Sequence, residues 1–472
     1  MSRFIITDRK TDYLMPPSLE DWLNQDHLAR FIVEVIDGLD LSNLVRHYAG
    51  RGSKAHHPAT LLAILVYGYA TGTFSSRKLE RATYDSVAFR YIAAGTHPDH
   101  DTLATFRRRF LREIEALFVQ VLELAGEMKV LKLGAVCLDG AKIHANASRH
   151  SALSYGHIEK LEARLKTEVQ ELLALAEQAD KADVPDGMSL PEELKRREDR
   201  LALMGVAKAK LEARAKERYV CERTEYDQKM ATRAGVDPAR EKKSRGKEPV
   251  APEVGPRDKD QINLMALALG HPVGQPPDEE SRIMPVSGGG FEQAYNAQAG
   301  VDATTMLVVA TGVTQATNDK QQVVPMLETL ASQTATQGKV EYLIADTGYF
   351  SAHNVNACDA AQIEPLIAVA RENHHPDWRE RHTEPAPLPA TATPAETMAH
   401  RVKTKDGRKR YALRKQTVEP VFGIMAQGHP VKSVMGFRQF SLRGLDKVRG
   451  EWSLVCLAWN LKRLAVLRPK FG

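Results

Sequence analysis

The same pattern of residues occurs twice in the chain, as Gly134-Ala-Val-Cys-Leu-Asp139-Gly140 and as Glu341-Tyr-Leu-Ile-Ala-Asp346-Thr-Gly348. Each copy is a short apolar run that ends on an aspartate and is followed by turn-forming residues. An apolar run of this length between turn formers predicts a buried strand. A carboxylate at the end of such a strand is carried by a rigid element and can still reach a cleft. We therefore expect Asp139 and Asp346 to lie at the ends of two buried strands.

Paired carboxylates of this kind indicate a metal site. Two aspartates with a third carboxylate nearby can hold paired divalent cations. The third candidate is Glu419, in Arg414-Lys-Gln-Thr-Val-Glu419-Pro. Glu451 is a rival, but it precedes an apolar helix, which favours a capping or structural role. Taken singly, each aspartate is more often a turn or cap residue than a ligand, so the spacing alone does not establish the site.

The composition is that of an ordinary globular protein. The 472 residues allow two or three domains, and 43% of them are hydrophobic and 26% charged. No stretch approaches the ~20 apolar residues of a membrane helix, and the N-terminus lacks a signal peptide. The four cysteines form no close pair, which argues against zinc and disulfides. We expect a cytoplasmic protein without membrane partners, whose net charge of +5 is compatible with a polyanion.

Residues from about 19 to 125 have the apolar spacing of successive helices. One of these helices opens at Asp101 and ends in the basic run Arg107, Arg108 and Arg109. Short helices with an arginine cluster on one of them are typical of a DNA-binding helical domain. The alternative is that the three arginines form an ordinary solvated face.

The remainder of the chain alternates strand and helix patterns. From His157 to about Gln228 the sequence is charged and helical, with an interruption at Asp183–Gly187, which predicts two long antiparallel helices. Strand character returns at 288–315 and 340–345, with a helix at 320–334 between them, and an apolar helix occupies 452–467. The chain is therefore expected to be of mixed α/β class.

Several separated blocks resemble the DDE transposases of bacterial insertion sequences, in the order found in that family. The blocks are Leu138-Asp139-Gly140-Ala-Lys-Ile-His-Ala-Asn146-Ala-Ser148, Ser281-Arg-Ile-Met, Tyr295-Asn296-Ala-Gln298, Gln315-Ala-Thr-Asn318-Asp319, Ala345-Asp346-Thr-Gly348-Tyr349 and Val418-Glu419-Pro-Val-Phe-Gly. The resemblance covers nearly the whole chain. It is to the branch with a helical InsH-like N-terminal domain and a long insert between the first and second aspartate.

The resemblance implies a fold and an activity. Residues 1–129 would form the helical DNA-binding domain and 130–472 an RNase H-like catalytic core, interrupted by a helical insert at about 155–280. Asp139, Asp346 and Glu419 would be the catalytic residues and bind two Mg²⁺ ions, for which Mn²⁺ can substitute. The ions activate water or a 3′-hydroxyl for in-line phosphoryl transfer. The implied partners are terminal inverted repeats and target DNA, bound by a homodimer at the nucleoid.

The resemblance also implies residues that bind DNA near the glutamate. The family has a Tyr-x2-Arg-x3-Glu-x6-Lys signature, and Tyr411 and Arg414 fit its first pair, although four residues separate Arg414 from Glu419. At the lysine position stands Ala426. Removal of Ala426–Val431 would bring Lys432 to that position, which predicts a six-residue insertion and a break in the helix after Met425.

Three functions remain open on the sequence alone. The first is an active transposase. The second is a catalytically decayed or domesticated DNA-binding copy, because the insertion at 426–431 and a second one at about 265–277 could disable the chemistry. The third is another metal-dependent nuclease on the same fold, which would cleave DNA without joining it to a target.

Overall fold

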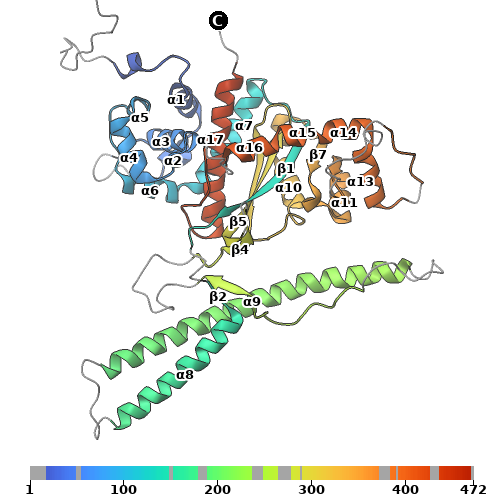
Figure 1. Cartoon of the computed structure of the whole chain (residues 1–472). Coiled ribbons are helices and arrows are strands. Elements are labelled where there is room, and N and C mark those ends of the chain that lie inside the picture. The colour runs from blue at the N-terminus through green and yellow to red at the C-terminus, as the bar shows by residue number, and fades with distance from the viewer. Residues whose placement is uncertain are drawn as a thin grey trace, which may run out of the picture. The chain divides into compact units, whose positions relative to one another are not determined.

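The structure is a computed structural model that describes residues 18–48, 55–147, 152–178, 189–236, 248–263, 278–286, 290–370, 383–389, 392–425 and 435–468. The chain divides into two compact units (Figure 1). The first comprises Met1–Ile143 and Tyr295–Gly472, and the second comprises His144–Ala294. The predicted insert at about 155–280 lies within the second unit. The N-terminal helices predicted as a separate domain, by contrast, share the first unit with the sheet.

Short helices fill the first part of the first unit, as the apolar spacing predicts. They are α1 (Leu28–Gly38), α2 (Ser42–Val45), α3 (Pro58–Ala70), α4 (Ser76–Asp85), α5 (Val87–Ile92), α6 (His100–Arg109) and α7 (Leu111–Glu127), preceded by a 3-10 turn at Leu19–Trp22. Proline stands in the first turn of α3, where its missing N–H is not needed. Asp99 caps α6 by accepting a hydrogen bond from the backbone N–H of Thr102.

A mixed sheet forms the second part of this unit. Its strands are β1 (Ala135–His144), β5 (Phe291–Asp302), β6 (Val308–Thr314), β7 (Tyr342–Ala345) and β8 (Glu364–Ile367). The order is β5-β1-β7-β8, and β6 pairs with β5. The pairs β1–β7 and β7–β8 are parallel, whereas β5–β6 is antiparallel. The two predicted strands are therefore neighbours in one sheet, and β7 ends directly before Asp346 as expected. The strand end predicted at Asp139 is wrong, because β1 continues through Asp139 to His144.

Further helices accompany the sheet in the first unit (Figure 1). They are α10 (Val323–Gln337), α11 (Ala352–Ala360), α13 (Pro394–Lys403), α14 (Lys405–Tyr411), α15 (Leu413–Gln416), α16 (Val418–Met425) and α17 (Leu445–Leu467).

Helix α17 joins the sheet to the N-terminal helices, because it packs against α7, α3 and β6. Its indoles donate to backbone carbonyls of the sheet region, Trp452 to Gln298 at 2.9 Å and Trp459 to Met306 at 2.8 Å. On its other side Glu451, fully buried, accepts a hydrogen bond from the Tyr69 hydroxyl of α3. The helix is thus a shared core element, which explains why no unit boundary falls near residue 129.

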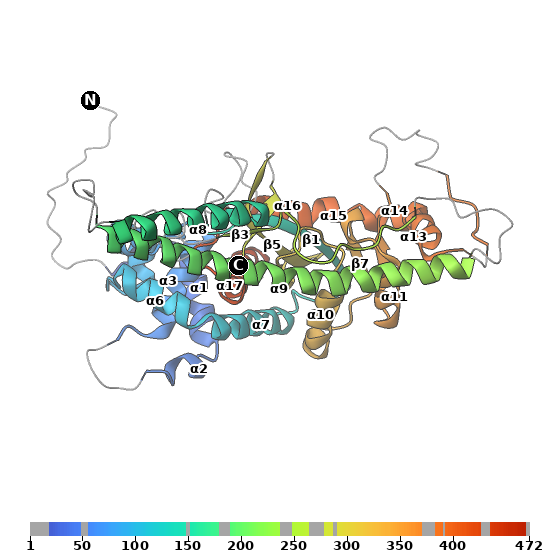
Figure 2. The same ribbon diagram turned by 90° about the horizontal axis from the view of Figure 1, so that it is seen from below.

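The second unit is built on two long helices that lie side by side, α8 (Tyr155–Gln178) and α9 (Leu190–Val236) (Figure 2). This confirms the predicted helical pair. The short strands β2 (Ala152–Ser154) and β3 (Gln261–Asn263) pair in antiparallel fashion, and β4 (Arg282–Pro285) pairs with the first residues of β5.

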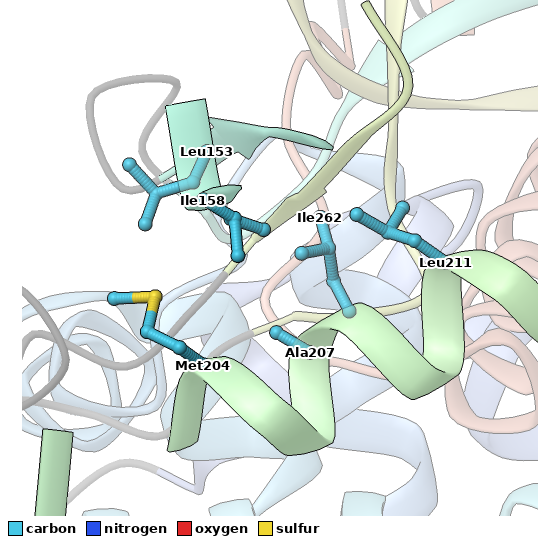
Figure 3. Packing of buried hydrophobic residues seen from close by; sticks show 6 residues of the cluster. All are labelled: Leu153, Ile158, Met204, Ala207, Leu211 and Ile262. Carbon is cyan, nitrogen blue, oxygen red and sulfur yellow. The ribbon is translucent and has the colours of Figure 1, made fainter. Parts of the chain in front are cut away.

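A small apolar core holds this unit together. Met204, Ala207 and Leu211 recur at helical spacing on α9, so their side chains share one face. They meet residues from β2, α8 and β3, namely Leu153, Ile158 and Ile262 (Figure 3). In the described part of the chain, no helix is both long and apolar enough to cross a membrane.

The close approach of α17 to α7 predicts the effect of one added methyl group. A Cβ on Gly450 would lie 2.5 Å from the Leu111 Cβ. Gly450→Ala should therefore lower the free energy of unfolding by about 1–3 kcal/mol through overpacking. Urea denaturation followed by tryptophan fluorescence measures this, because the described tryptophans Trp22, Trp452 and Trp459 lie in the first unit.

The matched control is Gly423→Ala in α16, where an added Cβ meets nothing within 4 Å. This variant should be neutral or stabilised by up to ~1 kcal/mol, because alanine has the higher helix propensity. Equal stability of the two variants would contradict the tight packing of α7 on α17.

Candidate active site

Asp139 and Asp346 lie at corresponding positions of two neighbouring parallel strands. Cys137 of β1 is in register with Ile344 of β7, and each aspartate follows two residues later. Asp139 Oδ1 accepts a hydrogen bond from the Gly140 N–H at 2.9 Å. Asp346 Oδ1 accepts one from the Gly348 N–H at 2.8 Å and so caps the 3-10 turn Thr347–Tyr349. Both carboxylates therefore lie at the level where β7 ends, although β1 continues past Asp139 to His144.

One guanidinium contacts all three carboxylates of the predicted triad. Arg414 Nη2 lies 3.5 Å from Asp139 Oδ2 and 3.6 Å from Asp346 Oδ2. Its Nη1 lies 3.0 Å from Glu419 Oε1. Arg414 belongs to α15 and Glu419 to the first turn of α16, next to the sheet (Figure 1). Residues that are far apart in the sequence are therefore gathered around a single cation.

The electrostatics of the site are dominated by partial burial. Burial raises the pKa of Asp139 to about 6, and the Arg414 guanidinium opposes this rise. The negative charges of Asp346 and Asp319 raise the pKa of Asp139 further. A carboxylate in this setting binds a cation readily, because a nearby positive charge relieves the cost of its burial.

The donor set fits a hard divalent cation, since Mg²⁺ and Mn²⁺ prefer carboxylate oxygens. In their present positions, however, no three acidic, histidine or cysteine side chains of the described residues are close enough to hold one ion. The Arg414 guanidinium lies within 3.6 Å of one oxygen of each of the three carboxylates. A divalent cation held by these carboxylates would therefore compete with Arg414.

The structure adds a fourth carboxylate, Asp319, which sequence reasoning did not select. It follows β6 and lies near the Asp346 turn, where an added Cβ on Gly348 would be 3.0 Å from Asp346 Oδ1 and 3.4 Å from Asp319 Oδ2. The pattern of a strand-end aspartate does not fit it, because it stands in a loop several residues after the strand. The sequence feature that could have identified Asp319 is the block that ends in Asn318-Asp319, one of the blocks that resemble the transposase family.

The three arginines at the end of α6 differ in their surroundings. Arg107 is buried, and its Nη1 donates to the Tyr69 hydroxyl at 3.0 Å and to the Phe74 carbonyl at 2.9 Å. Arg108 and Arg109 are exposed. A buried side chain with these partners fits neither the predicted phosphate contact nor a solvated face. Arg107 has a structural role instead, because its face of α6 packs inward.

The signature residues after α13 are only partly described. Tyr411 is the last residue of α14, and it precedes Arg414 closely. Lys432, the insertion at 426–431 and the second insertion at about 265–277 lie outside the described residues. The last carbonyls of α16 accept hydrogen bonds from later residues, Ile424 from the Met435 N–H and Met425 from the Phe437 N–H. This pairing fits a helix that ends at Met425.

Glu451, the rival third ligand, takes no part in this cluster. Its Oε1 accepts from Tyr69 and its Oε2 accepts from the N–H groups of Ser441 and Leu442, each at 2.9 Å. These three hydrogen bonds satisfy a fully buried carboxylate, which supports the structural role predicted for it.

Two family models match parts of the chain. The one described as "Transposase domain (DUF772)" matches residues 17–109, the region of α1 to α6. The one described as "Transposase DDE domain" matches residues 379–465, which include Arg414 and Glu419. Comparisons with curated proteins and with solved structures found no match. The two matches, in this order around a mixed sheet, place the chain among the DDE transposases of insertion sequences, DNA-transferring enzymes whose catalytic domain has an RNase H-like core.

Proposed function

We propose that this transposase cleaves DNA at terminal inverted repeats in a Mg²⁺-dependent reaction and transfers the ends to target DNA. The single observation that carries the proposal is the contact of one guanidinium with carboxylates from β1, from the turn after β7 and from α16. Three carboxylates that share one cation have the composition and placement needed to bind divalent ions.

Each residue has a proposed task in this reaction. Asp139, Asp346 and Glu419 would hold two Mg²⁺ or Mn²⁺ ions, which supply an activated attacking oxygen and stabilise the leaving oxygen. Arg414 occupies the same oxygens, so metal binding would release its guanidinium toward a DNA phosphate next to the carboxylates. Tyr411 and Lys432 would add contacts to the DNA backbone nearby.

DNA binding would involve the N-terminal helices as well. Arg108 and Arg109 at the exposed end of α6 would contact phosphates. We further propose a homodimer on DNA, because two transposon ends have to be cut and joined.

The catalytically decayed copy is the second candidate function. It is favoured by the sequence, in which Ala426 stands where the family signature has a lysine. The two candidates differ in whether the intact protein cleaves repeat DNA in the presence of Mg²⁺.

Removal of the negative charge of Asp139 or of Asp346 should abolish cleavage. Asp139→Asn and Asp346→Asn keep the side-chain shape but lose the charge that holds a hard cation, so the cleavage rate should fall by roughly 10³-fold or more. Binding to repeat DNA should be retained. Gel assays on labelled repeats from the DNA flanking the gene measure both. Asp359→Asn on the exposed face of α11 is the control for the same charge change.

The outcome separates the functions. Cleavage that persists in both variants would exclude Asp139 and Asp346 as ligands. Binding without cleavage by the unaltered chain would establish the decayed copy. Cleavage without joining to a target would establish a nuclease.

The affinity for Mn²⁺ should fall as the pH decreases through about 6, because the pKa of Asp139 is raised to about 6 by burial and a proton there competes with the cation. Affinity should be full above pH 7 and roughly tenfold weaker at pH 5, where most of this carboxyl is protonated. Electron paramagnetic resonance of free Mn²⁺ measures it. Equal affinity at both pH values in the unaltered chain would contradict the assignment of Asp139 as a ligand.

Neutralisation of the exposed arginines should weaken DNA binding without unfolding the chain. Each lost phosphate contact lowers the slope of log affinity against log salt by about 0.9, so the double variant Arg108→Gln/Arg109→Gln should lower it by nearly 2. Fluorescence anisotropy at several salt concentrations measures the slope. The charge-matched control is Arg164→Gln/Arg223→Gln, two exposed arginines of the second unit. An unchanged slope in the first variant would rule out these contacts.

A further inference from the structure

The fourth carboxylate, Asp319, is held by three donors from two strands. Its Oδ1 accepts hydrogen bonds from Asn296 Nδ2 and from Gln298 Nε2, each at 2.7 Å. The Lys142 ammonium lies 3.3 Å from Oδ1 and 3.4 Å from Oδ2. Asn296 and Gln298 are fully buried, and the side chains of Lys142 and Asp319 are 16% and 19% exposed. Asp319 is therefore fixed in position and paired with one cation.

The two amides are themselves oriented by further hydrogen bonds. The Tyr349 hydroxyl donates to Gln298 Oε1, which directs Gln298 Nε2 toward Asp319 and toward Asn296 Oδ1. This network also restricts the strand that carries Asp139. A Cβ on Gly140 would overlap the Gln298 amide nitrogen, so the residue after Asp139 has to be glycine.

Asp319 also touches the turn that carries Asp346. The Cβ position of Gly348 lies within 3.4 Å of both carboxylates, so only this glycine separates them. The two loops are joined a second time by Asn354, whose Nδ2 donates to the carbonyls of Lys320 and Tyr349, each at 2.7 Å. The negative charge of Asp319 thus stands at a fixed place beside the proposed metal ligands.

We propose that Asp319 and Lys142 form a positioning pair that acts on the Asp139–Asp346–Glu419 cluster without touching the DNA. Asp319 holds the turn at Gly348 and strengthens cation binding with its negative charge, whereas Lys142 weakens cation binding by neutralising Asp319. The pair sets the affinity of the cluster for divalent ions. This inference rests on the metal role in the proposed function.

The charges of Asp319 and Lys142 predict the direction in which each variant changes Mn²⁺ affinity. A unit charge a few ångström from a divalent ion changes its binding by on the order of tenfold. Asp319→Asn removes a negative charge and leaves Lys142 unopposed, so Mn²⁺ affinity should fall about tenfold. Lys142→Met leaves Asp319 held by the two amides and unneutralised, so Mn²⁺ affinity should rise. The Mn²⁺ affinity of the double variant should lie between the affinities of the two single variants.

The test is a Mn²⁺ titration of the full chain, followed by electron paramagnetic resonance, with folding checked by circular dichroism. Asp359→Asn serves as the exposed control for the same charge change, and its affinity should equal that of the unaltered chain. Opposite shifts in Asp319→Asn and Lys142→Met would support the pair. A fall in affinity in both variants would indicate a merely structural network and overturn it. If one variant fails to fold, the direction of the affinity change in the other still tests the proposal.

Asp346→Asn separates this proposal from the proposed function. A loss of Mn²⁺ affinity in Asp346→Asn together with unchanged affinity in Asp319→Asn and Lys142→Met would overturn the positioning pair alone. Equal Mn²⁺ affinity in Asp346→Asn and the unaltered chain would overturn the metal role of the site, and the positioning pair with it.

Discussion

The placement of Asp139 beside Asp346 depends on the register of the parallel strands β1 and β7. A slip of one residue would move one carboxylate by about 3.3 Å along its strand and turn it to the opposite face of the sheet. The register is enforced by burial, because Val136, Cys137 and Leu138 of β1 and the last three residues of β7 are fully inaccessible to solvent. The two aspartates are thus positioned by the buried apolar residues that precede them on the same strands.

Arg414 adds a second constraint, which is electrostatic. Three carboxylates drawn toward one point repel each other, and the guanidinium of α15 compensates this repulsion through contacts of 3.0–3.6 Å. In the same way, the Lys142 ammonium compensates the negative charge of Asp319. The site therefore contains its own cations, which keep the acidic side chains together and at the same time limit how strongly those side chains attract a metal ion.

The sequence predicted those parts of the structure that follow from local patterns. The two buried strands, the end of β7 before Asp346 and the helical pair α8–α9 were predicted correctly, because an apolar run or a helical stripe is readable without knowledge of distant contacts. The strand end at Asp139 was not, because β1 continues through it to His144. The surroundings of Arg107 were not, since helix periodicity does not say which face meets Tyr69. The boundary expected near residue 129 likewise ignored α17, a helix more than 300 residues later that packs on α3 and α7. Asp319 was missed because its role depends on donors from β1 and β5.

The hydrogen bonds at the end of α16 affect how a change in chain length after this helix acts on Glu419. Met435 and Phe437 donate hydrogen bonds to Ile424 and Met425, so the residues on either side of 426–434 are joined directly. The entropy of closing a loop grows only slowly with its length, and the fastened ends transmit little of any added length to the helix. Glu419, in the first turn of α16, is thereby set apart from changes of chain length beyond Met425.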